Sequence, residues 1–118
     1  MSQREDIIRI RHMLDAARKA AEFVRSRHRN DLDRDEQLAF SLTHLLEIIG
    51  EAAGKVSAES QKANPAIPWP KIVGMRNRLI HAYFDIDLDE IWRTVQEDLP
   101  PLIADLERVV SSYSRDIT

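Results

Sequence analysis

Four polar residues lie within one short segment of this 118-residue chain: Arg76, Asn77, His81 and Tyr83. A histidine titrates near neutral pH and can move a proton, and an arginine can stabilise a phosphoryl oxyanion. An asparagine or a tyrosine can orient a substrate. Together these are the groups that a metal-free ribonuclease requires, because the 2′-hydroxyl of RNA is itself the nucleophile in such an enzyme.

The segment from Pro70 to Tyr83 carries its apolar residues at helical spacing, which predicts a helix with Arg76 in the middle of the apolar face. A guanidinium keeps its proton, so an arginine at such a place needs a carboxylate, a phosphate or a subunit boundary as its partner. Glu47 and Glu51 are candidate carboxylates. The spacing supports a structural ion pair at least as well as a substrate role.

His81 falls about 140° round a regular helix from Arg76, whereas Asn77 shares the side of His81. On a regular helix, Arg76 and His81 of one chain would not converge on one atom. Two arrangements remove this conflict. Either the helix loosens near Ile80 and His81, or a symmetric dimer brings two copies of the segment together.

Three further segments carry apolar residues in steps of three and four, as amphipathic helices do. Their stripes run through residues 7–24, 38–56 and 88–109. Pro100-Pro101 interrupts the last stripe, which keeps its phase on both sides, so we expect one continuous helix with a kink there. With the helix over residues 70–83, these segments predict an all-α, up-and-down bundle of four long helices.

Gly50 and Gly54 lie one turn apart near the end of the second predicted helix. Each glycine costs about 1 kcal/mol in a helix interior relative to alanine. Close approach of another backbone is the reason that would offset this loss. The sequence leaves open whether that backbone belongs to the same chain or to a partner.

The composition indicates one globular domain, residues 1–118, with 43% hydrophobic and 31% charged residues and no cysteine. The absence of cysteine excludes thiol catalysis and disulfide scaffolds. No set of residues has metal-ligand spacing, and we expect neither a metal nor a cofactor. No apolar run approaches the ~18 residues of a membrane span, so we expect no membrane association and a cytoplasmic location. Because the net charge is −3, contact with RNA should be local.

The segment Arg76-Asn-Arg-Leu-Ile-His-Ala-Tyr83 matches an R-x4-H-x-Y signature, and the chain resembles the HepT-like toxins of the HEPN superfamily. The resemblance covers nearly the whole chain. It extends to five more segments: Leu46–Gly54, Ile67–Gly74, Asp85–Asp87, Ile91-Trp92 and Leu99–Leu102.

The resemblance implies an all-α homodimer with the motif helices at an interface cleft, and metal-independent cleavage of RNA. In that family pattern Arg76 and His81 are catalytic, Asn77 supports them and Tyr83 lies beside them. The resemblance also implies a cognate minimal nucleotidyltransferase antitoxin, which neutralises the toxin by attaching AMP to the tyrosine of the motif, here Tyr83.

Two other hypotheses use the same residues. In the first, the chain is a non-catalytic nucleotide- or substrate-binding partner of a nucleotidyltransferase, with Arg76 as a phosphate clamp. In the second, Arg76 and His81 are interface residues of a purely structural all-α dimer.

Overall fold

The structure is a computed structural model that describes residues 3–81 and 85–116. Within this part of the chain it is helical apart from two short paired strands, which confirms the all-α prediction. The elements in chain order are α1 (Gln3–Phe23), α2 (Asp31–Arg34), α3 (Glu36–Gly54), α4 (Ala58–Ala63), α5 (Trp69–Val73), α6 (Met75–Leu79), β1 (Ile80–His81), β2 (Asp85–Ile86), α7 (Leu88–Arg93), the π-helix η1 (Thr94–Asp98) and α8 (Leu99–Asp116).

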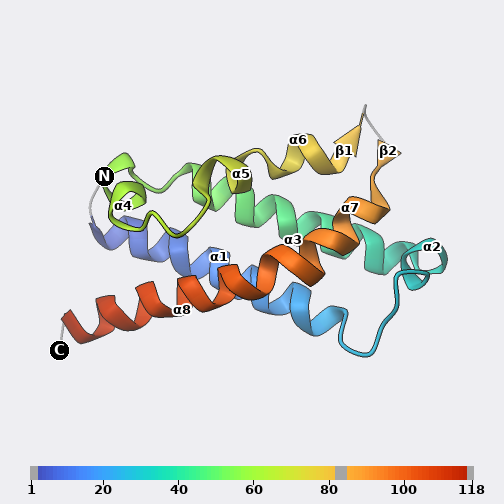
Figure 1. Ribbon diagram of the computed structural model, residues 1–118, viewed down its shortest axis with the longest axis horizontal. Helices are drawn as coiled ribbons and strands as arrows, with labels where there is room; N and C mark the ends of the chain where they lie inside the picture. Colours follow the sequence, from blue (N-terminus) through green and yellow to red (C-terminus); the bar gives the residue numbers. More distant parts are fainter. Residues whose placement is uncertain (1–2, 82–84, 117–118) are drawn as a thin grey trace.

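The three long helices form the body of the molecule. Helix α1 packs against both α3 and α8, and α5 and α6 lie along α3 (Figure 1). The ends of α1 and α8 that lead to the two termini lie at one end of the molecule, and β1 and β2 lie toward the other end. No helix in the described residues is both long enough and apolar enough to span a membrane.

The core is built from the apolar stripes that the spacing predicts. One face of α1 and one face of α3 are buried against each other, and burial of apolar surface of this kind is the main stabilising contribution to folding. The largest fully buried side chains include Met13, Leu42, Leu46, Ile49, Leu79, Ile91, Leu99 and Leu106.

The prediction of one long helix over residues 70–83 is wrong. Gly74 separates α5 from α6, and the helix ends at Leu79, where the chain becomes extended at Ile80 with φ −117° and ψ 116°. Strand β1 then pairs with β2 in antiparallel register, with Ile80 opposite Ile86. Both isoleucines pack against the core, so tertiary packing outweighs the local helical periodicity. The described chain therefore has three long helical segments, and not four.

The last predicted helix is helical without interruption from residue 88 to residue 116. Its irregular part is η1, which lies directly before Pro100 and Pro101. A proline ring clashes with the carbonyl group four residues earlier, which here belongs to Gln96 or Glu97. Both carbonyl groups belong to the wider π-helical turn, so the distortion expected at the proline pair lies in the turn that precedes it.

The connection from α3 to α5 is fixed by hydrogen bonds to a buried carboxylate on α1. Asp6 accepts hydrogen bonds from the backbone N–H and hydroxyl of Ser57, at 2.9 and 2.6 Å, and from the hydroxyl of Ser60. Burial alone would raise the pKa of Asp6, but these hydrogen bonds outweigh burial and lower it. Further along, the indole N–H of Trp69 donates to the carbonyl of Asn64 at 3.0 Å, which fixes the start of α5.

Helix α5 approaches α3 closely at Gly50. A Cβ atom at Gly50 would lie 3.0 Å from the carbonyl oxygen of Ile72, whereas at Gly54 the nearest atom would be a methyl carbon of Val73 at 3.9 Å. The predicted close backbone approach is therefore confirmed at Gly50, and the backbone belongs to the same chain. This contact sets the distance between α3 and the segment that carries Arg76.

We expect Gly50→Ala to be less stable than Gly54→Ala by about 1–3 kcal/mol, because both variants gain helix propensity but only Gly50→Ala overpacks the contact with Ile72. The measurement is urea unfolding followed by far-UV circular dichroism. Equal stability of the two variants would contradict the close contact.

Candidate active site

Arg76 lies on α6 with its side chain 71% exposed, and its Nε is 3.3 Å from Oε2 of Glu47 on α3, whose side chain is 34% exposed. The carboxylate partner that the sequence predicted is therefore present. The predicted position inside an apolar face is wrong, because α6 is only five residues long and buries Met75 and Leu79 while Arg76 faces outward. Exposure leaves the guanidinium accessible to a ligand.

A shallow groove of about 520 Å³ surrounds the Arg76 side chain. Helices α3, α5 and α6 form its walls. It is lined by Glu47, Gly50, Glu51, Gly54, Val73 and Arg76. The two glycines keep the α3 wall low, so the groove is open along the helix beside the guanidinium.

The structure places the other motif residues around the end of α6. Asn77 is exposed and adjacent to Arg76 on the helix, and its backbone N–H donates to the carbonyl of Gly74 at 3.1 Å. The main chain of His81 is part of β1, opposite Asp85. Tyr83 lies outside the described residues.

The end of α6 at Leu79 resolves the angular conflict between Arg76 and His81. The separation of about 140° applies only if the helix continues through His81. Because His81 lies in an extended strand, the first of the two arrangements, in which the helix loosens, is the one observed. The angular argument for a second copy of the segment is thereby removed.

A network of ion pairs that the sequence did not predict ties α6 to the elements after the strands. Nη1 of Arg78 lies 3.2 Å from Oε1 of Glu90, and Nη2 of Arg93 lies 2.5 Å from the same oxygen. Arg93 also reaches Asp98 at 3.1 Å, and Nζ of Lys71 lies 3.4 Å from Asp98. We refer to these five side chains as the ion-pair network.

The network shifts the pKa values of its acids. The hydrogen bond from Arg93 is the main reason that the pKa of Glu90 lies below its ordinary value. Burial alone would raise the pKa of Asp98, but the hydrogen bond and charge of Arg93, with a contribution from Lys71, outweigh burial and lower it. The same two carboxylates raise the pKa of Arg93.

Glu90 did carry a sequence signal of a different kind. Asp87 and Glu90 have the spacing of a helix N-cap and the residue it caps, and the side chain of Asp87 does accept a hydrogen bond from the backbone N–H of Glu90 at 3.0 Å. The spacing of Glu90 and Arg93 allows a pair on one helix face. No sequence signal connects either of them to Arg78.

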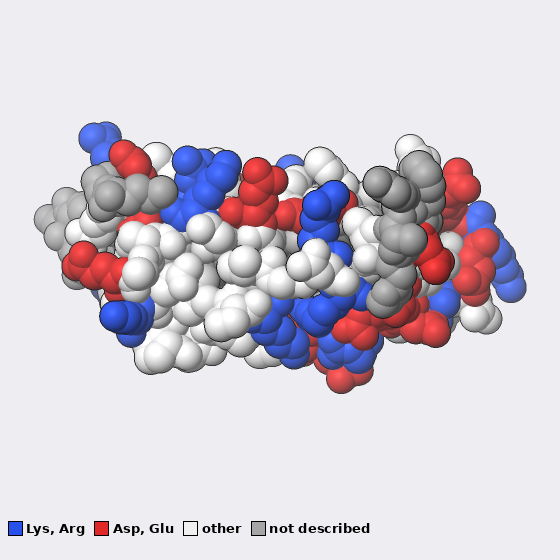
Figure 2. Space-filling model, turned by 90° about the horizontal axis from the view of Figure 1, so that it is seen from above, with Lys and Arg blue, Asp and Glu red and all other residues white. Residues whose placement is uncertain are grey.

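Lys71 and Arg78 lie close to Arg76 in the sequence and could have added positive potential for RNA, but the structure pairs both with carboxylates. Figure 2 shows the side on which α4, α5 and α6 lie, with a broad area free of Lys, Arg, Asp and Glu, bordered by charged side chains of both signs. Positive charge near the motif is therefore largely compensated. In the part of the chain that the structure describes, no cluster of three or more His, Asp or Glu side chains could hold a metal ion.

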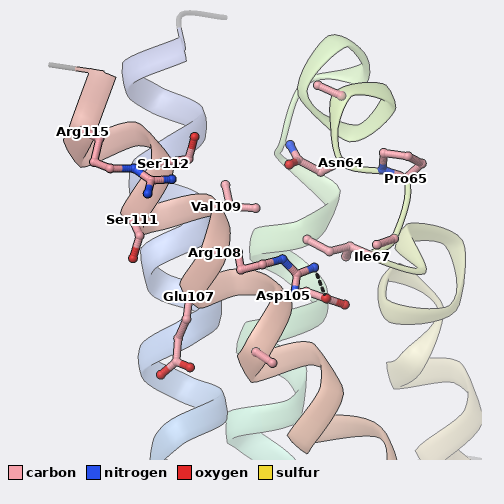
Figure 3. Close-up of a pocket in the computed structure, with 13 residues that line it drawn as sticks. Asn64, Pro65, Ile67, Asp105, Glu107, Arg108, Val109, Ser111, Ser112 and Arg115 are labelled. Atoms are coloured by element: carbon pink, nitrogen blue, oxygen red, sulfur yellow. Dashed lines mark hydrogen bonds and ion pairs between the residues drawn. The ribbon is translucent and has the colours of Figure 1, made fainter.

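A larger groove, of about 820 Å³, lies between the loop before α5 and the second half of α8 (Figure 3). Asn64, Pro65 and Ile67 line one side, and Arg108, whose guanidinium pairs with Asp105, lies on the other. No residue of the segment 76–81 lines this groove. It lies toward the end of the molecule near the termini, away from β1 and β2, and is not part of the candidate site.

The fold and the site define an all-α protein that carries an exposed arginine on a short helix directly before a strand with a histidine. The chain matches the ribonuclease HepT-like family over residues 13–109, and it belongs to that family. No solved structure gives a significant match.

Two relatives illustrate the similarity. The chain is 39% identical over 88 residues to the probable ribonuclease HepT of Thermococcus cleftensis, covering 75% of this chain and 80% of the relative. It is 33% identical over 109 residues to the putative RNase MJ1380 of Methanocaldococcus jannaschii, covering 92% of this chain and 100% of the relative.

The two arginines of α6 should differ in their effect on stability. We expect Arg76→Gln to change the free energy of unfolding by less than about 0.5 kcal/mol, because its ion pair is exposed. We expect Arg78→Gln to cost about 1–2 kcal/mol, because Arg78 is 32% and Glu90 25% exposed and the loss leaves Glu90 with one arginine fewer. Urea unfolding at neutral pH measures both.

The same comparison in acid tests the charge of Glu90. Because the folded-state pKa of Glu90 is depressed, its stabilising contribution is complete above about pH 4.5 and is lost as the pH falls through the lower folded value. The cost of Arg78→Gln should therefore be constant from neutral pH down to about pH 5 and shrink below about pH 4.5. A cost that stays constant in acid would show that Glu90 is not the partner.

Proposed function

We propose that this protein is a metal-independent endoribonuclease with Arg76 and His81 as its catalytic residues. Membership of the ribonuclease HepT-like family supports the activity. The observation that carries the site is the exposed guanidinium of Arg76 in an open groove, five residues before His81. Asn77, exposed beside Arg76, is a supporting residue, and Tyr83 completes the motif.

In the proposed reaction the 2′-hydroxyl of a ribose attacks the adjacent phosphorus atom. The imidazole of His81 accepts the hydroxyl proton as the bond from the 2′ oxygen to phosphorus forms. The bond from phosphorus to the 5′ oxygen of the next nucleotide breaks, and that oxygen takes a proton from water. Arg76 stabilises the charge that develops on the non-bridging oxygens. The products are a 2′,3′-cyclic phosphate and a 5′-hydroxyl.

We further propose that the protein acts as a homodimer with the motif segments of two copies at a shared cleft. The open groove beside Arg76 and the exposed side chain of Val73 in its wall are consistent with a second copy covering this face. A two-fold axis there would bring two Arg76 side chains to one RNA strand and increase the local positive charge.

The proposed physiological setting is a two-gene toxin–antitoxin pair. A cognate minimal nucleotidyltransferase antitoxin would attach AMP to the hydroxyl of Tyr83. A nucleotide on Tyr83 would add negative charge and bulk two residues after His81, and both effects oppose the binding of an RNA phosphate.

Arg76→Ala and His81→Ala should each abolish RNA cleavage and growth arrest, while helicity and sedimentation remain those of the dimeric wild type. The assay is cleavage of a defined RNA in the presence of EDTA, with analysis of the product ends. We expect cleavage by the wild type to survive EDTA and to leave a 2′,3′-cyclic phosphate. The matched control is Arg25→Ala, because Arg25 is an exposed arginine whose ion pair in the described part of the chain is with Glu22, three residues earlier.

Full activity of His81→Ala, or strict dependence of the wild type on added Mg²⁺, would contradict the proposed mechanism. A purified protein that binds nucleotide and cuts no RNA at any concentration would instead support the non-catalytic binding partner.

Tyr83→Phe should retain RNA cleavage and lose neutralisation by the antitoxin, because phenylalanine has no hydroxyl to accept AMP. Co-expression with a nucleotidyltransferase encoded beside this gene, followed by mass spectrometry of the purified chain, measures the modification. Tyr113→Phe, on α8, is the matched control and should be modified like the wild type. AMP found on a residue other than Tyr83 would overturn this assignment.

A further inference from the structure

The paired strands β1 and β2, which include the main chain of His81, are short, and Ile80 and Ile86 attach them to the core. Each strand has two residues, and an isolated pair of this size has marginal stability in water. The base of the strand pair is closed by the backbone N–H of Asp87, which donates to the carbonyl of Leu79 at 2.8 Å. The position of the strand pair relative to α6 should therefore depend on contacts made by the flanking helices as well as on the packing of Ile80 and Ile86.

The ion-pair network supplies such a contact across the base of the strand pair. Arg78 lies three residues before His81, and Glu90 lies on α7, directly after β2. Their ion pair at 3.2 Å joins α6, which precedes the strand pair, to α7, which follows it. Arg93 holds the same carboxylate through both of its oxygens, at 2.5 and 3.2 Å.

Arg78 also makes a contact with α5. Its Nη2 donates to the backbone carbonyl of Lys71 at 3.1 Å, and the side chain of Lys71 pairs with Asp98. The guanidinium thus contacts α5 and α7 at once while it belongs to α6. Because its planar fork fixes the geometry of both contacts, Arg78 is committed to internal partners and is poorly available to RNA.

We propose that Glu90 is a positioning residue, whose ion pair with Arg78 helps to fix strand β1, which contains His81, relative to α6. This inference rests on the proposed function. Arg76 reaches Glu47 on α3, while Arg78 reaches Glu90 on α7, so α6 is held from two sides. The pair with Glu90 holds the C-terminal end of α6, which is followed by β1 and His81. Loss of the pair should misplace the histidine relative to the arginine, and small displacements of this kind reduce the catalytic rate strongly.

The test is a double-mutant cycle of Glu90→Gln and Arg78→Gln, measured by steady-state cleavage of RNA at a temperature at which all variants are folded. We expect each variant to lower kcat about tenfold or more with KM changed less than about threefold. The double variant should be no slower than the slower single variant, because both remove the same contact. Glu97→Gln, on the exposed face of η1, is the control for the loss of one negative charge and should match the wild type.

Two results would overturn the inference. A rise in KM with kcat unchanged would make Arg78 an RNA-binding residue, and additive effects in the double variant would show that the two side chains act independently. If Glu90→Gln does not fold, Arg78→Lys replaces it in the assay. It keeps the positive charge but lacks the fork, so we expect kcat to fall while KM is retained, and unchanged kcat would overturn the inference.

Amide hydrogen exchange separates this inference from the proposed function, because it requires no activity. In Glu90→Gln the amide of Asp87 should exchange at least about tenfold faster than in the wild type, while core amides of α1 and α3 keep their rates. An unchanged rate at Asp87 would overturn the positioning role. If the wild type cleaves no RNA, the proposed function fails. The exchange rate of the Asp87 amide then decides alone whether Glu90 fixes the position of β1.

Discussion

The contact between the Ile72 carbonyl and Gly50 is the constraint on which the candidate site depends. It brings α5 so close to α3 that even a Cβ atom at Gly50 would lie only 3.0 Å from the Ile72 carbonyl oxygen, and α6 follows α5 after a single residue. Arg76 is thereby held within reach of Glu47, and the groove beside it has the α3 backbone as one wall. A larger residue at Gly50 would press on the Ile72 carbonyl and push α5 away from α3.

The two arginines of α6 show how burial divides one residue type between two roles. Arg76 is exposed and makes one ion pair, whereas Arg78 is half-buried and contacts both a carboxylate and a backbone carbonyl. An exposed pair contributes little to stability, so Arg76 can exchange Glu47 for a phosphate at small cost. Release of the half-buried guanidinium of Arg78 would leave Glu90 with one arginine fewer and the carbonyl of Lys71 without this donor. The first arrangement suits a ligand-binding residue and the second suits a structural one.

The sequence predicts the parts of this fold that local periodicity determines. The stripes of α1, α3 and the helical segment from α7 to α8 could be read directly, as could the cap at Asp87. For Arg76 the sequence offered Glu47 and Glu51 as candidate partners, and the structure pairs it with Glu47. The angular conflict between Arg76 and His81 raised a break near Ile80 as one of two alternatives. The sequence could not decide between them, because residues 70–83 have helical spacing and the packing of Ile80 and Ile86 on the core, which favours the strands, appears only in the fold. Arg78 and Glu90 meet for the same reason, since only the reversal of the chain between β1 and β2 brings them together.

The ending of α6 before His81 also changes what the motif spacing means. Five residues from Arg76 to His81 would place the two side chains on different faces of a continuous helix. In the observed fold the segment from Arg76 to His81 contains the end of α6 and the two residues of β1. The direction of the strand, and not the helical angle, therefore sets where the main chain of His81 lies. The geometry of the motif then depends on whatever fixes the strand. Three described contacts do so: the β1–β2 pairing, the hydrogen bond of Asp87 with Leu79, and the ion-pair network. Each of them has a partner outside the segment from Arg76 to His81.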